Sequence, residues 1–157
     1  MATLPIVQEG DGILRQRAMP VEKVTKRIQK LITDMFETMH QAEGVGLAAP
    51  QVGEGLRIIV VDVDEGAFAL VNPVIVAARG EETELEGCLS LPGRVGYVTR
   101  AAEVVVRGLN RQGKQTEVAG GGLLARALQH EIDHLDGVLF TDRATGIGNQ
   151  KGQGTEG

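Results

Sequence analysis

The feature that most constrains this chain is the motif His-Glu-Ile-Asp-His at residues 130–134. Residues 123–129 before it are good helix formers without a breaker, and glycines flank the whole run. On a helix, His130 and His134 lie at i and i+4, so both imidazoles leave one face about one turn apart. This spacing suits two ligands of one metal ion, with Glu131 beside them as a candidate general base. The alternative is that two ordinary surface histidines share a helix by chance.

Length, composition and charge favour one globular domain. The chain has 157 residues, of which 42% are hydrophobic and 24% are charged. Its net charge is −5 and no cluster of Lys and Arg stands out, so nucleic acid is not an expected partner. The single cysteine excludes an intrachain disulfide and is compatible with a reducing compartment. Since the sequence shows neither a signal peptide nor an 18-residue apolar run, we expect a cytoplasmic location without membrane contact.

Apolar spacing predicts an amphipathic helix over residues 21–41. Its apolar residues recur in steps of three and four, and they are Val24, Ile28, Leu31, Ile32, Met35, Phe36 and Met39. Pro20 suits the first turn, and we expect His40 to be a surface residue at the C-terminal end, where the helix dipole favours a cation. The small residues at 44–51 then predict a loop that either packs tightly or approaches a ligand closely.

Runs rich in β-branched and other apolar residues predict strands, and these occupy residues 57–63, 67–71, 74–78, 95–99, 103–109 and 114–118. Asn72 and Pro73 interrupt the second and third runs, and residues 110–113 have the composition of a hairpin turn. Because the strands follow one another without intervening helices, the expected class is α+β, with mainly antiparallel strands packed around the central metal-binding helix and the amphipathic helix as a second helix. We expect one domain over residues 1–143 and a flexible, Gly-rich tail over residues 144–157.

The identity of a third ligand decides which chemistry the histidine pair supports. In one class of His-Glu-x-x-His peptidase it is a downstream Glu, but the only later Glu here is Glu156, in the tail. In another class it is a His, and its place falls on Phe140. The only thiol lies upstream at Cys88, and a free cysteine is usually a small buried hydrophobe. Beside two histidines, however, a thiolate completes a catalytic ligand set that leaves a fourth position for water.

Three motifs occur in a characteristic order along the chain. They are G-x-G-x-A-A-x-Q at residues 44–51, E-G-C-L-S at residues 86–90 and H-E-x-x-H at residues 130–134. Together they resemble the peptide deformylase family, whose members remove the N-formyl group from nascent bacterial proteins. A peptidase and a non-catalytic metal-binding domain are the alternatives, but merely holding an ion requires neither Glu131 nor Gln51.

The resemblance implies a metal centre and a proton carrier. Cys88, His130 and His134 would hold one divalent ion, with Fe(II) favoured and Zn(II), Ni(II) or Co(II) also compatible with the ligand set. The ion would activate water as a nucleophile near neutral pH. Glu131 would take a proton from that water and later pass one to the departing amine.

The same resemblance assigns the substrate contacts. The side-chain amide of Gln51 and the backbone N–H of Leu89 would stabilise the oxyanion, and the Gly46 backbone would hydrogen-bond the formamide N–H. Helical spacing from His130 suggests an apolar pocket for the methionine side chain, or plain core packing, and its residues would be Val45, Leu123 and Ala127. The expected partners are formyl-methionyl nascent peptides and, transiently, the ribosome, although the long C-terminal helix of many relatives has no counterpart here.

Several residues around the site carry weaker expectations. Glu86 is expected to make a charge-assisted bond that braces the E-G-C-L-S segment, and the resemblance suggests Arg100 as its partner. Asp133 either supports a metal ligand or is solvated, and we expect the solvated state. Many relatives have an arginine at the position of Val95, and here the arginine is Arg94. This shift concerns how the peptide is held rather than the reaction itself.

Overall fold

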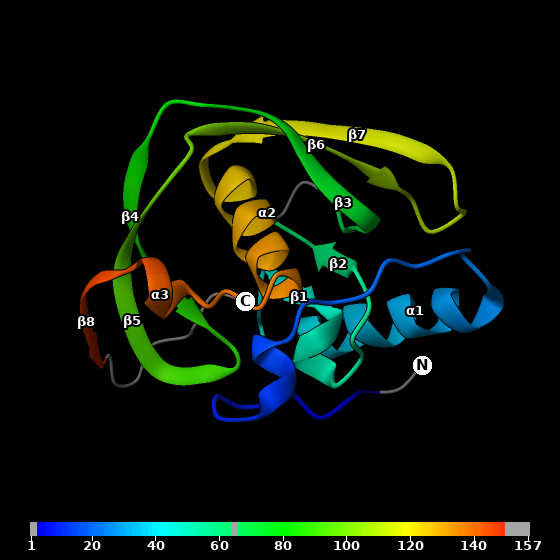
Figure 1. Ribbon diagram of the computed structural model, residues 1–157, viewed down its shortest axis with the longest axis horizontal. Coiled ribbons are helices and arrows are strands. Elements are labelled where there is room, and N and C mark those ends of the chain that lie inside the picture. The colour runs from blue at the N-terminus through cyan, green and yellow to red at the C-terminus, as the bar shows by residue number, and fades with distance from the viewer. Residues whose placement is uncertain (1–2, 64–65, 150–157) are drawn as a thin grey trace.

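Two antiparallel sheets pack around one central helix in the computed structural model, which describes residues 3–63 and 66–149 (Figure 1). The five-stranded sheet has the order β1-β2-β3-β6-β7, and its strands are β1 (Gly46–Ala48), β2 (Ile58–Val61), β3 (Phe68–Arg79), β6 (Glu103–Leu109) and β7 (Gln115–Gly121). The three-stranded sheet has the order β4-β5-β8, and its strands are β4 (Glu82–Cys88), β5 (Leu91–Arg100) and β8 (Thr145–Asn149). The helices are α1 (Lys26–Gln41), α2 (Gly122–Leu135), the short α3 (Phe140–Arg143), and two 3-10 turns, η1 (Gly12–Arg15) and η2 (Ala49–Val52). The predicted α+β class is confirmed.

Helix α1 buries the apolar face that its periodicity predicts. Ile28, Ile32, Met35 and Met39 are buried in one cluster with residues of β1 and β2. The predicted start at residue 21 is wrong, because Thr25 is the N-cap and its hydroxyl accepts a hydrogen bond from the Ile28 N–H. The capping group, rather than Pro20, therefore determines where this helix begins.

Helix α2 lies between the two sheets and is buried on most of its surface (Figure 1). Ala125, Leu128, Ile132 and Leu135 share one cluster with inward-facing residues of the five-stranded sheet. Gly121 is the N-cap and provides no side-chain hydrogen bond to the first turn. Because packing on several sides holds this helix, its histidines have a fixed position relative to both sheets.

The five-stranded sheet differs from the predicted strands in two places. Strand β3 continues through Asn72 and Pro73 as one bulged strand, with Asn72 at φ 54° and its side chain bonded to the Val21 backbone N–H and carbonyl. The small residues of β1 were expected in a loop, but they pair with residues 59–61 of β2. Small side chains have low strand propensity, so this pairing left no pattern in the sequence.

The C-terminal segment corrects the predicted tail. Strand β8 pairs with β5, in the register Arg94 to Asn149, Val95 to Gly148 and Tyr97 to Thr145, so residues 145–149 are part of the fold. A ladder of backbone hydrogen bonds needs no apolar periodicity, which explains why a Gly-rich composition did not predict it. The rest of the predicted tail, residues 150–157, lies outside the described residues.

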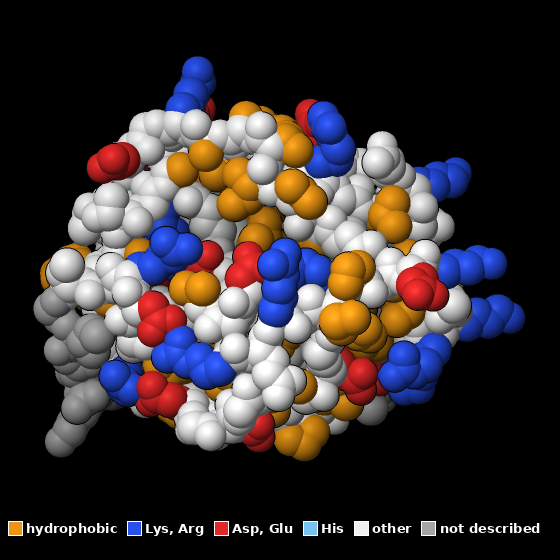
Figure 2. Space-filling view, in the orientation of Figure 1, with side chains coloured by type: hydrophobic (Ala, Val, Ile, Leu, Met, Phe, Trp, Pro, Cys, Tyr) orange, Lys and Arg blue, Asp and Glu red, His pale blue; other side chains and the backbone are white. Residues whose placement is uncertain are grey.

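The visible surface in Figure 2 mixes charges of both signs, and hydrophobic side chains gather near the top, over β3 and the N-terminal end of α2. Exposed large hydrophobic residues of these two elements are Val74, Ile75, Val76 and Leu123. Within residues 3–63 and 66–149, no helix has both the length and the apolar character needed to cross a bilayer.

Candidate metal centre and active site

Cys88, His130 and His134 converge although Cys88 lies 42 residues before His130. Cys88 ends β4, and both histidines face it from α2. One possible ligand atom from each residue lies within 4.8 Å of the other two, and all three residues are buried. Cys88 Sγ is 3.3 Å from His134 Nε2, and the centroids of the two imidazole rings are 5.0 Å apart. These distances bring together the ligand set proposed from the sequence.

The chemistry of these atoms fits a cation. Four buried side-chain atoms lack a hydrogen-bond partner in the described part of the chain: His130 Nε2, His134 Nδ1 and both carboxylate oxygens of Glu131. Leaving a buried polar atom unpaired costs about 1–3 kcal/mol, so such atoms generally have a partner. A divalent ion held by Cys88 Sγ, His130 Nε2 and His134 Nε2 would give the unpaired His130 Nε2 a partner, whereas His134 Nδ1 is the ring nitrogen that does not face Cys88. Burial lowers the pKa of His134, which favours the neutral imidazole that binds metals.

Glu86 holds His130 in the orientation that a metal ligand needs. The Nδ1–H of His130 donates to Glu86 Oε1 at 3.0 Å, which leaves Nε2 facing the cluster. Arg100 donates to both oxygens of Glu86, at 2.6 and 2.9 Å, as the family resemblance suggested. Burial alone would raise the pKa of Glu86, but hydrogen bonds from His130 and Arg100 outweigh it and lower the pKa to about 2. Glu86 is therefore a carboxylate throughout the neutral range.

Glu131 is fully buried beside the two histidines. Burial raises the pKa of Glu131 to about 7, against the lowering effect of charges at His130 and Arg100. Gly46 packs directly against it, since a Cβ at position 46 would lie 2.6 Å from Glu131 Oε2. Glycine at 46 thus makes room for the carboxylate, which is a steric reason that the sequence did not reveal.

Gln51 has one defined amide orientation. Its Oε1 accepts a hydrogen bond from the Ala48 N–H at 3.0 Å, so the amide NH₂ points toward Cys88 Sγ at 3.6 Å and Ser90 Oγ at 3.2 Å. Leu89 follows Cys88 directly, and its partly buried side chain covers Gly44. The Gln51 amide of η2 therefore contacts both the Cys88 sulfur and the Ser90 hydroxyl, on either side of Leu89 in the sequence.

The three predicted pocket residues come together beside the metal ligands. They line one small pocket with parts of β4 and α2, and the lining residues are Val45, Glu86, Gly87, Leu123, Arg126, Ala127 and His130. Its volume is about 10 Å³, enough for about one water molecule. Leu123 closes it from outside and is 42% exposed.

Two supporting residues differ from their sequence-based description. Asp133 was expected to be solvated, which is wrong: it accepts hydrogen bonds from Arg100 Nη1 at 2.9 Å and Arg143 Nε at 2.6 Å. Arg126, which the sequence analysis did not single out, is buried and donates to Glu86. Its position one turn before His130 was the available signal. Arg94 forms an ion pair with Glu9 at the surface.

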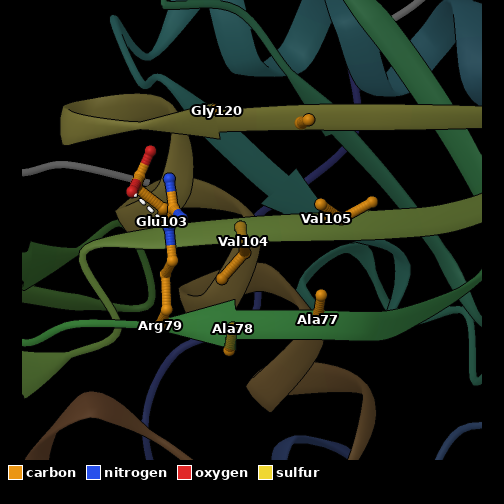
Figure 3. Close-up of a pocket in the computed structure, with 8 residues that line it drawn as sticks. Ala77, Ala78, Arg79, Glu103, Val104, Val105 and Gly120 are labelled. Carbon is orange, nitrogen blue, oxygen red and sulfur yellow. Dashed lines mark hydrogen bonds and ion pairs between the residues drawn. The ribbon is translucent and has the colours of Figure 1, made fainter.

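Another hollow of the surface lies away from this cluster. It is a shallow, largely apolar depression of about 340 Å³ on the five-stranded sheet, where Ala77 of β3 lies beside Val105 of β6 (Figure 3). At one end, the Arg79 Nε donates to Glu103 at 2.6 Å. Its lining contains no histidine or cysteine, so the candidate metal site is the cluster of Cys88, His130 and His134.

Two imidazoles and a buried carboxylate on α2, with the sulfur of Cys88 at the end of β4, form the donor set of a metal-dependent hydrolase. Comparison with known proteins narrows this class. A family model for polypeptide deformylase matches residues 3–150. The peptide deformylase of Pelotomaculum thermopropionicum is 57% identical over 94% of this chain and 95% of its own length. This chain belongs to the peptide deformylase family, whose enzymes remove the formyl group from newly made polypeptides.

Solved structures agree with this assignment. The crystal structure of peptide deformylase from Thermotoga maritima superimposes with a TM-score of 0.90 and 42% identity, covering 92% of this chain and 99% of that one. The enzyme from Synechococcus elongatus, solved in complex with actinonin, gives a TM-score of 0.88 and 41% identity, covering 92% of this chain and 80% of that one. The fold is therefore the one that solved peptide deformylases have.

Proposed function

We propose that this chain removes the formyl group from N-terminal formylmethionine with one divalent ion held by Cys88, His130 and His134. The observation that supports the ligand assignment is the convergence of these three buried groups, with His130 Nε2 left unpaired and His134 Nε2 facing Cys88 Sγ. A thiolate with two imidazoles accepts Fe(II), Zn(II), Ni(II) or Co(II), and we favour Fe(II) on family resemblance. When bound, the ion supplies Lewis-acid chemistry, polarising the formyl group and producing a nucleophile from water near neutral pH.

Glu131 moves the protons of the reaction. Its carboxylate takes a proton from the attacking water and then delivers one to the departing amine nitrogen. A pKa near the working pH is the best compromise between these two tasks, and burial raises the pKa of Glu131 to about 7. Gly46 leaves the carboxylate the room that it needs beside β1.

Gln51 and Leu89 stabilise the negative charge that develops on the formyl oxygen. The Ala48 N–H holds the Gln51 carbonyl oxygen, so the amide NH₂ is already turned toward Cys88 before substrate arrives. An amide donates without changing its own charge, which suits an oxyanion donor. The Leu89 N–H adds a backbone donor immediately after the thiolate ligand.

The substrate chain fits between two strand edges. β1 is an edge strand of the larger sheet and β4 is an edge strand of the smaller one. Val45, before β1, and Gly87, in β4, line the same pocket, so an extended peptide placed here has backbone partners on both sides. The Gly46 carbonyl accepts the formamide N–H, and the methionine side chain enters between Val45 and Ala127 once Leu123 rotates outward.

A peptidase is the second candidate, and one observation speaks against it. Phe140 occupies the place of a peptidase's third histidine, and its buried ring stacks on His130 with centroids 6.3 Å apart. A phenyl ring cannot coordinate a metal ion, so Phe140 supports His130 by packing against it.

We place the reaction in the cytoplasm, where nascent chains are made; transient contact with the ribosome is part of this proposal.

The proposal is tested by assaying formate release from a formyl-methionyl peptide while following the integrity of the peptide. Loss of the formyl group with every peptide bond intact is expected. Cleaved internal bonds without formate would refute it in favour of the peptidase.

A further inference from the structure

Arg126 joins the metal-binding helix to the sheet that carries Cys88. It lies on α2 one turn before His130, and its side chain is 7% exposed. Its guanidinium Nη1 donates to Glu86 Oε2 at 2.5 Å and to the Val98 carbonyl at 2.9 Å, and Nη2 donates to the Glu82 carbonyl at 2.8 Å. One side chain of α2 therefore has acceptors on both β4 and β5.

Two of these acceptors are backbone carbonyls, which makes the connection geometrically specific. The Glu82 carbonyl of β4 and the Val98 carbonyl of β5 are part of the sheet backbone and are fixed with it, whereas a side-chain carboxylate can rotate to follow a moving partner. The planar guanidinium with its fixed fork of donors suits three acceptors in fixed directions, and a lysine ammonium does not reproduce that fork. The bonds of Arg126 consequently define the distance between α2 and the strand that ends at Cys88.

Arg126 also completes the environment of Glu86. Oε2 of Glu86 accepts from Arg126 and Arg100, while Oε1 accepts from Arg100 and from the His130 Nδ1–H. Arg100 comes from β5, in the same sheet as Glu86, so it braces the carboxylate from its own sheet. Arg126 comes from the helix that carries His130, so it braces the same carboxylate from the helix side.

We propose that Arg126 is a positioning residue of the metal centre: it locks the Cys88 strand against the histidine helix and fixes the Glu86 carboxylate that orients His130. This inference rests on the proposed ligand set of Cys88, His130 and His134. Arg126 touches neither the ligand atoms nor the substrate's formyl group, and it acts through Glu86 and the two carbonyls. Groups that orient ligating histidines in this way typically change metal affinity about 10–100-fold when replaced.

The test uses the full chain loaded with Co(II), because a thiolate-to-Co(II) absorption band reports Cys88 coordination directly. The variants are Arg126→Met, which keeps the aliphatic stem along the pocket, and Arg126→Lys, which keeps the charge. The control is Arg107→Met, since Arg107 is an exposed arginine paired with Glu117 at 3.0 Å on β6 and β7. The readouts are the rate of Co(II) release to a chelator, the thiolate band, and thermal melting of each metal-free protein.

Both Arg126 variants are expected to release Co(II) about 10–100-fold faster than wild type, with a weakened or shifted thiolate band, whereas the control is unchanged. If Arg126→Met does not fold, Arg126→Lys alone decides, because it retains the buried charge. Release rates and bands equal to wild type, even with a lower melting temperature, would show that Arg126 has only a structural role. Absence of the thiolate band in wild type would instead overturn the ligand assignment on which the inference rests.

Discussion

Replacing Gly46 with alanine is expected to impair the proton carrier while leaving the metal ligands in place. A Cβ at this position would lie 2.6 Å from Glu131 Oε2, 2.9 Å from its Cγ and 3.1 Å from its Cδ. Ordinary van der Waals contact begins near 3.4 Å, so the carboxylate or the strand must move by about 0.8 Å. The strand is held by its pairing with β2, and Glu131 is fully buried on α2.

The magnitude follows from this displacement. A misplacement of about 1 Å in a reacting group costs on the order of 100-fold in rate, which corresponds to about 2.7 kcal/mol of lost transition-state stabilisation. The added methyl group also overpacks the site, which destabilises the fold by about 1–3 kcal/mol. The three heavy atoms nearest to the new Cβ all belong to Glu131, rather than to Cys88, His130 or His134. Metal content is therefore expected to stay at the wild-type level.

The assay compares kcat/KM for formate release, metal content and melting temperature in wild type and Gly46→Ala. The matched control is Gly55→Ala, because a Cβ at Gly55 meets no heavy atom within 4 Å. An activity within twofold of wild type in Gly46→Ala would refute the steric argument. A loss of activity that follows loss of metal would point to the ligands instead of Glu131.

The remaining predictions concern single side chains of the site. Cys88→Ser is expected to lose most of its metal after gel filtration, because a serine hydroxyl is not deprotonated at neutral pH; full metal content would exclude Cys88 as a ligand. Glu131→Gln is expected to lower kcat by about 10²–10⁴-fold with metal retained, and a wild-type rate would exclude proton transfer by Glu131. Because the folded-state pKa of Glu86 is lowered to about 2 from 4.5, its stabilisation is present above pH 4.5 and is lost as pH falls toward 2. Denaturant unfolding of the metal-stripped protein is expected to show a loss of about 3 kcal/mol over this range that Glu86→Gln lacks, and parallel curves would contradict it.

Local sequence patterns predicted the main elements well, and they singled out the three residues that the fold brings together as proposed ligands. His130 and His134 are placed by helical spacing alone, and the motif around Cys88 supplied the third group by resemblance. The α+β class followed from successive strands without intervening helices. Each of these predictions depends on residues within one short segment or on one recognisable motif.

What the sequence missed depends on contacts between distant segments. Arg126 bonds to carbonyls 28 and 44 residues away, and nothing about an arginine in a helix indicates such acceptors. Asp133 has arginine partners from β5 and α3, so its position on a helix face did not reveal these ion pairs. Strand β1 contains Gly46 and Ala48, which have low strand propensity, and it pairs with β2 along one edge of the sheet. Tertiary packing, rather than local preference, decided each of these cases.

The most direct test of the central claim follows one formyl-methionyl peptide through reaction with metal-loaded protein under anaerobic conditions. Formate and the masses of all peptide products are measured together, before and after the metal is removed with a chelator and restored. We expect one formate for each peptide consumed, an intact peptide with a free N-terminal methionine, and activity that disappears and returns with the metal. Internal cleavage without formate, or formate release that survives metal removal, would contradict a deformylase that works through Cys88, His130 and His134.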